Sequence, residues 1–361
     1  MSIDVTRRDF LKLSALGLGS LALPSRQQID FQDFPQFERL GRVIAAGIPL
    51  HSRPTADSIV TRRLAEDEII PVLHRVVGHR PFRINQNWVE TLEGYVWSPE
   101  VQPVRNLPNQ PVPALPSTTL GDGMWVEVSV PYVNLQLANP PARAPWLVNR
   151  LASGQPARFF YSQIVWIDQI KIVDDGQVLY RLNERFGYGD KFWAVAEAFR
   201  PLTAEEMSPI HPEMEDKRIR VDINEQTISC FEGNNEVYFA RASTGAFLNN
   251  RGERVDGWGT PLGRHRIWRK AVSLPLSGGS AATGWDLPGV GWISLFVGSG
   301  VALHSTYWHN NFGVPTSRGC VNLRPVDALW TFRWTLPQVV YDPGDITVGM
   351  PGGTLIEVIE R

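Results

Sequence analysis

Apolar and polar residues alternate over short stretches along most of the chain, and this period of two is typical of β-strands. Two clear runs are residues 125–130 and 218–223. Turn residues separate such runs, and Asp174-Asp175-Gly176 is a predicted hairpin turn. The pattern therefore predicts a mainly β protein.

Changes in this pattern divide the chain into segments. A polar linker at 27–40 follows an unusual N-terminal segment at 1–26. A Pro-rich stretch predicts a semi-rigid, extended spacer between two groups of short strands, and a third β pattern begins after Pro209. The predicted parts that follow the linker are a small β module at 41–105, the spacer at 106–120, a second small β module at 121–208 and a C-terminal domain at 209–361.

Composition narrows the functional classes. The 361 residues are 43% apolar, which suffices for several cores, and 28 Pro, 31 Gly and 13 Trp favour turn-rich β folds. Charged residues are 20% and the net charge is −2, so nucleic acid is not an expected partner. The two cysteines, Cys230 and Cys320, allow one disulfide bond as an alternative to a free thiol.

The N-terminal segment resembles a twin-arginine export signal. Arg7-Arg8-Asp9-Phe10-Leu11 precedes an uncharged apolar run from Leu13 to Leu23. That run is too short to cross a hydrocarbon core of ~30 Å as a helix. The alternative is an ordinary amphipathic helix. The resemblance implies export to the cell wall or a periplasm-like space, with a weak membrane tether if the segment is not cleaved. Soluble cofactors are scarce there, so no cofactor is expected.

The chemistry is concentrated in His304-Ser305 and Ser317-Arg318-Gly319-Cys320-Val321-Asn322. A free thiol with a pKa near ~8.5 is mostly protonated at neutral pH, so a nucleophilic cysteine needs a base within reach. His304 precedes Cys320 by 16 positions, and the two meet if the chain doubles back as neighbouring strands. The backbone N–H groups of Gly319 and Cys320 are candidate oxyanion donors, and Arg318 is expected to lower the pKa of the thiol.

Other interpretations use the same residues. A cysteine on an apolar strand is often a small buried hydrophobe, which is our interpretation of Cys230. His304, His309 and Cys320 provide three ligands for zinc but no obvious fourth, so no metal site is expected.

The motif resembles the catalytic domain of the L,D-transpeptidase (YkuD) family over about residues 215–360. Further matches are Val221-Asp222-Ile223, Ser243-Thr244-Gly245, the turn Thr260-Pro261-Leu262-Gly263 and a helix-like segment at 326–330. The first β module resembles a bacterial Src-homology-3-like barrel. The implied fold is two small β-barrel-like modules followed by a β-sandwich-like catalytic domain. Trp88 and Trp97 are either core residues of the first module or wall-binding aromatics.

The resemblance implies a role for each motif residue. Cys320 is the nucleophile, His304 is the general base, the backbone carbonyl of Ser305 orients His304, and Gly319 allows close approach of the substrate. The implied substrate contacts are Ser317, Tyr307, Arg318, His309 and Asn322. Arg318 stands where the family more often has histidine, so a proton-donor role for a second histidine is in doubt here.

The implied activity is peptidoglycan cross-linking through a thioester on Cys320. Donor and acceptor stem peptides are the implied substrates, and carbapenems are expected to label the cysteine. The alternatives are an L,D-carboxypeptidase that uses the same site, or a wall-binding protein without catalysis. The Gly- and Trp-rich region at 285–296 is either a lid or substrate wall, or an ordinary strand and turn.

Overall fold

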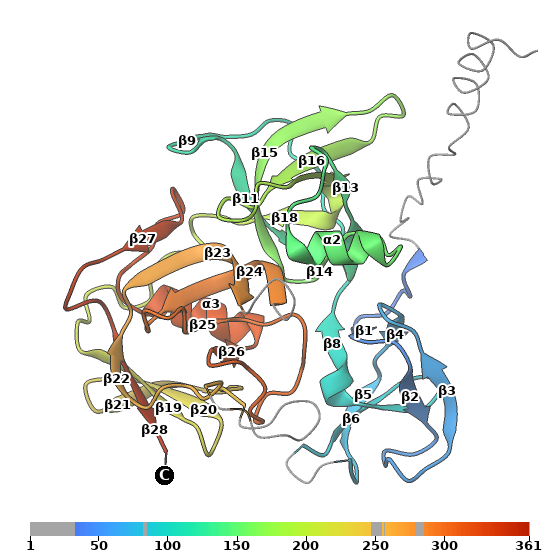
Figure 1. The fold of residues 1–361 in the computed structure, drawn as a ribbon, viewed down its shortest axis with the longest axis horizontal. Helices are drawn as coiled ribbons and strands as arrows, with labels where there is room; N and C mark the ends of the chain where they lie inside the picture. Colours follow the sequence, from blue (N-terminus) through green and yellow to red (C-terminus); the bar gives the residue numbers. More distant parts are fainter. Residues whose placement is uncertain (1–32, 82–84, 247–254, 256, 279–284, 361) are drawn as a thin grey trace, which may run out of the picture.

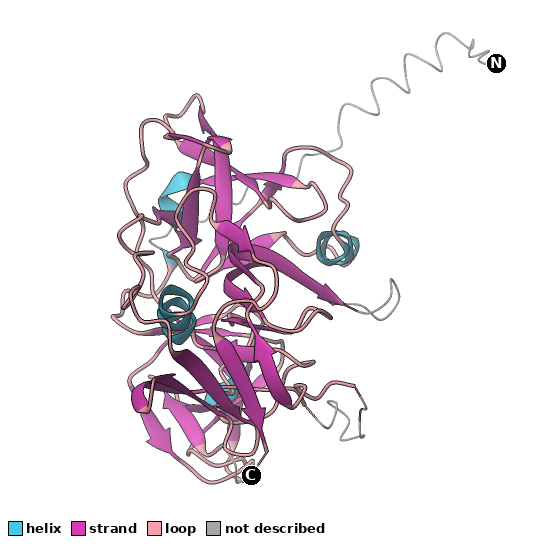
Figure 2. Ribbon diagram, turned by 90° about the vertical axis from the view of Figure 1, so that its left-hand side faces the viewer, coloured by secondary structure: helices cyan, strands magenta, loops and turns pink. Residues whose placement is uncertain are grey.

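The computed structural model describes residues 33–81, 85–246, 255, 257–278 and 285–360 (Figure 1). The predicted export signal and most of the 27–40 linker lie outside these residues. Strands dominate the described chain (Figure 2), so the predicted mainly β class is confirmed. No helix in this part of the chain combines the length and apolarity that a membrane crossing requires.

The first module consists of two antiparallel sheets that pack around one core of Val, Ile and Leu side chains. The three-stranded sheet has the order β4 (Ile69–Pro71), β1 (Leu40–Val43), β8 (Val101–Val104). The five-stranded sheet has the order β3 (Val60–Leu64), β2 (Ile48–His51), β7 (Tyr95–Trp97), β6 (Asn87–Glu90), β5 (His74–Val77). A single 3₁₀ turn, η3 (Ser98–Glu100), connects β7 to β8.

The barrel-like closure expected for this module is not found among its described strands, because no strand of one sheet is hydrogen-bonded to the other. Trp88 is only 1% exposed and meets His51 edge-on, at 5.3 Å between the ring centres. Trp97 is half-buried and its Nε1–H donates to the carbonyl oxygen of Asn85 at 3.0 Å. Both tryptophans therefore serve the packing of the module.

The second module is built on a six-stranded antiparallel sheet. Its order is β13 (Gln136–Leu137), β17 (Lys191–Val195), β16 (Val178–Asn183), β15 (Ile164–Ile172), β11 (Met124–Val128), β18 (Phe199–Pro201). Two smaller pairs, β9 (Ser117–Thr118) with β10 (Gly121–Asp122) and β12 (Tyr132–Asn134) with β14 (Arg158–Phe160), complete its strands. The 3₁₀ turn η4 (Ala196–Ala198) precedes β18.

Two features of the second module differ from the prediction. Helix α2 (Pro145–Ala152) was not expected; proline at its first position suits a helix start, and Leu147 is its buried residue. The Pro-rich stretch at 106–120 packs against the module instead of standing free. Its Val112 N–H donates to the hydroxyl of Tyr180 at 2.7 Å.

The C-terminal domain contains two five-stranded sheets. The first has the order β21 (Asn235–Arg241), β20 (Thr227–Glu232), β19 (Lys217–Asp222), β28 (Leu355–Ile359), β22 (Gly263–Arg266). The second has the order β26 (Val321–Leu323), β25 (Ala302–Ser305), β24 (Trp285–Leu295), β23 (Arg269–Gly278), β27 (Asp345–Thr347). The predicted helix at 326–330 is part of α3 (Pro325–Trp334). The 285–296 region is β24, a strand paired along its length with β23, and thus not a lid.

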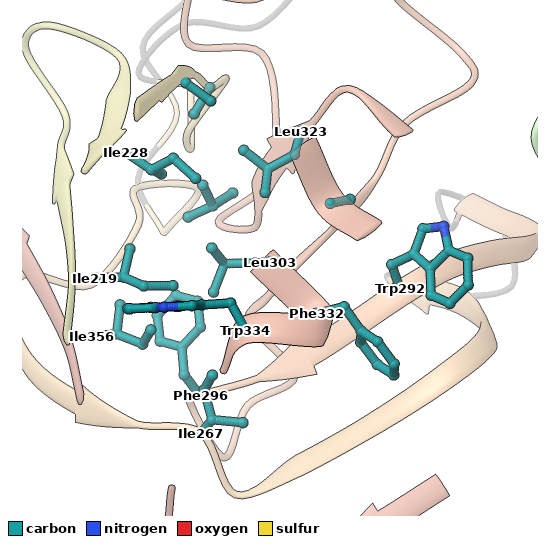
Figure 3. Close-up of a cluster of buried hydrophobic side chains, with 14 of the residues drawn as sticks. Ile219, Ile228, Ile267, Trp292, Phe296, Leu303, Leu323, Phe332, Trp334 and Ile356 are labelled. Carbon is teal, nitrogen blue, oxygen red and sulfur yellow. The ribbon is translucent and has the colours of Figure 1, made fainter. Parts of the chain in front are cut away.

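One apolar core joins the two sheets and α3. Ile219, Ile228, Ile356, Leu303 and Phe332 come from all three elements and meet there (Figure 3). Cys230 is fully buried in the same core, both cysteines are free thiols, and the disulfide alternative is wrong. Trp125, Ile164 and Trp166 of the second module extend this core, so the second module and the C-terminal domain share buried surface.

Candidate active site

Cys320 and His304 project from the same face of the second sheet of the C-terminal domain. Strands β25 and β26 are parallel, with Leu303 opposite Val321 and His304 opposite Asn322. Side chains of a strand alternate between faces, so Cys320, Asn322 and His304 point one way while Leu303 and Val321 point into the main core. Cys320 belongs to the separate apolar cluster on the other face, which includes Ala302 and Trp308.

The histidine ring is fixed by its neighbour in the chain. Nδ1 of His304 lies 2.8 Å from the carbonyl oxygen of Ser305. A carbonyl oxygen only accepts, so Nδ1 carries the proton, and Nε2 of the neutral ring keeps a free lone pair. The ring of Trp308 lies beside the histidine ring, tilted by 36° to it, with 5.6 Å between the ring centres. His304 is therefore held in the tautomer that can accept a proton at Nε2.

The pair is neutral in the resting site. Burial lowers the pKa of His304 to about 4, although its bond to Ser305 acts in the opposite direction. Burial raises the pKa of the Cys320 thiol to about 11, and the backbone N–H of Ala302 offsets this only in part. The Cys320 sulfur lies 3.9 Å from the carbonyl oxygen of Gly300. The thiolate expected from the sequence would thus form only as the proton moves to a base.

Arg318 does not have the expected effect on the thiol. Its side chain is exposed and its guanidinium lies over the ring of Trp258, 4.8 Å from the ring centre. Burial, the dominant influence, moves the pKa of the Cys320 thiol upward. The Arg318 side chain therefore lies at the surface, while the thiol sits in an apolar environment.

Ser317 and Thr260 shape the turn that carries the cysteine. The hydroxyl of Ser317 donates to the carbonyl oxygen of Cys320 at 2.5 Å and accepts the N–H of Gly319 at 3.1 Å. Thr260 donates to the carbonyl oxygen of Gly319 at 2.8 Å. Gly319 has a φ of +119°, a value that favours glycine. Because its N–H is bonded to Ser317, Gly319 is not a ready oxyanion donor, and the N–H of Cys320 is the other predicted candidate.

His309 and Asn322 form a second polar group beside the pair. Nδ1 of His309 accepts the N–H of Asn311 at 3.1 Å, and Nε2 lies 2.8 Å from the side-chain amide of Asn322 and 3.3 Å from the hydroxyl of Thr316. Burial, then the proximity of His304, lowers the pKa of His309 to about 3. His309 is neutral and engaged, so it acts as a support for the loop as the structure stands.

Tyr307 is a core residue here. It is 4% exposed, its hydroxyl donates to the carbonyl oxygen of Pro288 at 3.0 Å, and its ring stacks with Phe160 at 6.2 Å between centres. This differs from the substrate contact implied by the resemblance. The buried hydroxyl is already hydrogen-bonded, so Tyr307 contributes to the packing of this face of the sheet.

The loop between His304 and Cys320 is bonded to the first module, which the sequence did not predict. Arg42 donates to the carbonyl oxygen of Tyr307 at 3.2 Å, and the Asn85 amide donates to the side-chain oxygen of Asn311 at 2.9 Å. The side chain of Asn310 donates to the hydroxyl of Ser98 at 3.1 Å. These partners are more than 200 residues apart in the chain, so no local sequence signal could have revealed them.

Two other residues that hold the site in place, Thr260 and Ser243, belong to motifs that were already visible in the sequence. Thr260 belongs to the turn motif that already pointed to the family, and Ser243 belongs to another. Ser243 pairs with Asn322 through the backbone and its hydroxyl donates to the carbonyl oxygen of Asn311 at 2.7 Å. Nothing in the sequence pointed to Trp308 as a site residue except that it lies close to His304 in the chain. Among the described residues, no group of three or more His, Cys, Asp or Glu side chains converges as metal ligands would.

The site thus combines a half-buried thiol, a neutral imidazole of fixed tautomer on the same sheet face, and a glycine turn. This is the class of arrangement that supports acyl transfer through a cysteine. Residues 216–356 match the family model described as the L,D-transpeptidase catalytic domain. Over these residues the chain carries a catalytic domain of the L,D-transpeptidase family.

Several solved structures are similar to the chain. A carbamoyl enzyme of Ldtfm with avibactam is 22% identical, covers 42% of this chain and has a TM-score of 0.31. An L,D-transpeptidase mutant of Enterococcus faecium is 21% identical over 41% of this chain, with a TM-score of 0.30. The matches span only 51% and 52% of those two chains.

A third structure, the LD transpeptidase LdtMt1 in complex with imipenem, is 19% identical over 69% of this chain and 100% of its own, with a TM-score of 0.31. A comparison with curated proteins found no match. The assignment therefore depends on the family model.

Proposed function

We propose that this protein is a peptidoglycan L,D-transpeptidase that works through a thioester on Cys320 with His304 as general base. One observation carries the proposal. Within a domain of this family, Cys320 and His304 share one sheet face, and the Ser305 carbonyl leaves Nε2 of His304 as the free proton acceptor.

In the first step the sulfur of Cys320 attacks the carbonyl carbon of the third stem-peptide residue while Nε2 of His304 takes the thiol proton. The tetrahedral oxyanion is stabilised by the backbone N–H of Cys320 at the turn. The C–N bond to the terminal D-alanine then breaks as the imidazolium returns its proton to the leaving amine. The products are a thioester and free D-alanine.

In the second step the side-chain amine of a neighbouring stem attacks the thioester. His304 accepts a proton from the attacking nitrogen and delivers it to the departing sulfur as the C–S bond breaks. A new peptide bond forms, which makes a 3→3 cross-link, and the neutral thiol and imidazole are restored. Water in place of the amine gives L,D-carboxypeptidase activity from the same site. An assay of stem tetrapeptide with and without an acceptor amine separates the two outcomes.

The experiment that tests the nucleophile is intact-mass analysis after incubation with imipenem. We expect one adduct per chain in the wild type and in Cys230→Ala, because Cys230 is sealed in the core, and none in Cys320→Ala. His304→Gln should slow adduct formation by roughly 10²–10⁴-fold, the usual contribution of a general base.

An adduct that persists in Cys320→Ala would refute the assignment. If the wild type forms no adduct but binds purified sacculi, the protein is a non-catalytic wall-binding protein.

We also propose export by the twin-arginine route, based on Arg7-Arg8 and the apolar run behind them. The test is fractionation of cells that express the wild type or a variant with both Arg7→Lys and Arg8→Lys. The variant should accumulate in the cytoplasm, whereas equal export of both proteins would contradict the proposal.

A further inference from the structure

A pocket of about 440 Å³ opens in the first module beside the catalytic domain. Three arginines line it, Arg39 at the edge of β1, Arg75 on β5 and Arg105 just after β8. The second module contributes Tyr161 and the catalytic loop contributes Asn310, so the pocket exists only in the assembled chain. Its volume lies in the range usual for small-ligand sites.

The three arginines have no acidic partner in the described part of the chain. None of them forms an ion pair with a described carboxylate, whereas Arg42 and Arg158 nearby both pair with Asp67, at 2.7 and 2.8 Å. The arginines of the pocket thus present positive charge that the fold itself does not neutralise. Arginine is well suited to bind carboxylates through two parallel hydrogen bonds.

A further arginine, Arg324, lies close enough to Arg75 to affect it, although it does not line the pocket. Burial, and then the charge of Arg324, lowers the pKa of Arg75. Arg324 lies at the start of α3 in the catalytic domain, so two modules bring like charges together at this place. Arg324 is itself paired with Asp327 at 2.6 Å, so the charge that an anion in the pocket would meet is that of Arg39, Arg75 and Arg105.

The floor of the pocket is apolar. It is formed by Leu40, Val101 and Val104, which are 2%, 1% and 3% exposed. A ligand that matches the pocket therefore combines carboxylates with short aliphatic groups. An acidic peptide with alanine-like side chains has this combination, whereas a bare inorganic anion leaves the apolar floor uncovered.

The pocket adjoins the loop that joins His304 to Cys320. Asn310, which lines the pocket, donates through its backbone N–H to the carbonyl oxygen of Pro99 at 3.3 Å and through its side chain to Ser98. A ligand in the pocket would contact the same segment of chain that carries Trp308 and His309.

We propose that this pocket is a binding site, separate from the catalytic cysteine, for the carboxylates of an acidic peptide. The identity of that peptide as a second peptidoglycan stem rests on the proposed function; the preference for an acidic peptide does not. The site would hold a strand against the first module while the reacting strand occupies Cys320.

The test is calorimetric titration of a stem tetrapeptide into the full chain carrying Cys320→Ala, which prevents turnover. A variant that adds Arg39→Gln, Arg75→Gln and Arg105→Gln should bind at least tenfold more weakly, since it loses the charge-assisted hydrogen bonds from the guanidinium groups to the carboxylates. The matched control replaces three exposed arginines outside the pocket, Arg53, Arg63 and Arg264, with Gln and should bind as the parent does.

Two further arms identify the ligand chemistry. The same tetrapeptide with its carboxylates amidated should lose most of its affinity, and inorganic phosphate at equal concentration should fail to compete. Equal affinity of the pocket variant and the parent, unchanged binding of the amidated peptide, or full competition by phosphate would each overturn the proposal.

Imipenem labelling of Cys320 in the arginine variant with its cysteine restored separates this question from the proposed function. Labelling at the wild-type rate shows an intact catalytic site, so a binding loss then belongs to the pocket. If the wild type is not labelled but binding depends on the arginines, the acidic-peptide site stands and only the stem identity is withdrawn.

Discussion

Nδ1 of His304 and the carbonyl oxygen of Ser305 lie 2.8 Å apart, and this single contact decides which nitrogen can act as a base. Burial keeps both reacting groups neutral, with the pKa of His304 lowered to about 4 and the pKa of Cys320 raised to about 11. A resting ion pair between thiolate and imidazolium would require the opposite shifts. At the residue scale the site therefore favours proton transfer coupled to attack over a preformed nucleophile.

The neutral pair predicts an unusual pH profile. The rate constant for acylation by imipenem should stay nearly constant from pH 8 down to about 5, and fall only as His304 becomes protonated, with an apparent pKa near 4. Stopped-flow measurement of adduct formation against pH checks this. An acid limb centred near the ordinary histidine value of 6.5 would show that burial does not control the base.

At the scale of elements, the catalytic loop is held from outside its own domain. Asn85 is 4% exposed, donates to Asn311, and accepts the Trp97 indole N–H at its backbone carbonyl. The first module thus acts as a support for the segment that follows His304. Bonds to Tyr307 and Asn311 flank Trp308 in the chain, so they help to hold its ring beside His304.

Asn85→Ala should slow acylation of Cys320 by roughly 3–10-fold, because the loop loses a positioning bond while the reacting groups remain. The measurement is the imipenem acylation rate together with the melting temperature. Asn139→Ala is the control, since Asn139 is a half-buried asparagine of the second module that donates to the carbonyl oxygen of Gly189 and accepts the N–H of Lys191. Equal acylation rates in the two variants would show that Asn85 does not position the catalytic loop.

Helix α3 depends on a buried lysine at its C-terminal end. The ammonium of Lys270 on β23 donates to the carbonyl oxygens of Phe332, Thr335 and Pro337 at 2.6, 2.7 and 2.9 Å. These contacts satisfy the carbonyl of Phe332 in the last turn, that of the C-cap residue Thr335 and that of Pro337 beyond the helix, and place a positive charge at the negative end of its dipole. Burial lowers the pKa of Lys270 well below its ordinary value.

Lys270→Met should destabilise the protein by about 2–5 kcal/mol, because three buried carbonyls lose their donor. Urea denaturation of the variant against wild type measures this. The exposed Lys171→Met serves as control and should change stability by less than about 0.5 kcal/mol. A similarly small effect of Lys270→Met would mean that water replaces the ammonium.

At the scale of the molecule, the three parts pack as neighbours and not as a catalytic domain on a tether. Trp125 and Trp166 of the second module enter the core of the catalytic domain, and Gln163 donates to the carbonyl oxygen of Pro288 at 2.6 Å. The first module meets the catalytic loop directly. The Pro-rich stretch between the modules packs along the second module, where the N–H of Val112 is bonded to Tyr180.

The buried groups also predict how global stability depends on pH. The folded pKa of His304 lies below its ordinary value of 6.5, so the unfolded chain binds protons first and stability falls as pH drops from about 6.5 towards 4. The folded pKa of Cys320 lies above its ordinary value of 9.0, so stability also falls as pH rises above about 9.

Chemical denaturation at pH 7.5 and 4.5 tests the acid side. The wild type should lose more stability between these values than His304→Gln, which has no group to protonate there. Equal losses in the two proteins would show that His304 is not buried in its neutral form.

The sequence predicted those structural features that are set by residues close together in the chain. Alternating apolar positions predicted β19, and the hairpin turn at Gly176 predicted the pairing of β15 with β16, because these signals lie within a few residues. The motif around Cys320 identified the family of the domain for the same reason. Helix α2 was missed since it is short and has one buried residue.

The sequence by itself determined the β class, the order of the parts and the residues with reactive groups. Only the tertiary structure decided that the thiol and imidazole are neutral, that Tyr307 is a core residue and that Arg42 and Asn85 hold the catalytic loop. The physical reason is that pKa values and loop positions follow from burial and from contacts between residues far apart in the chain. Contacts of this kind cannot be predicted from the spacing of residues within a short stretch of sequence.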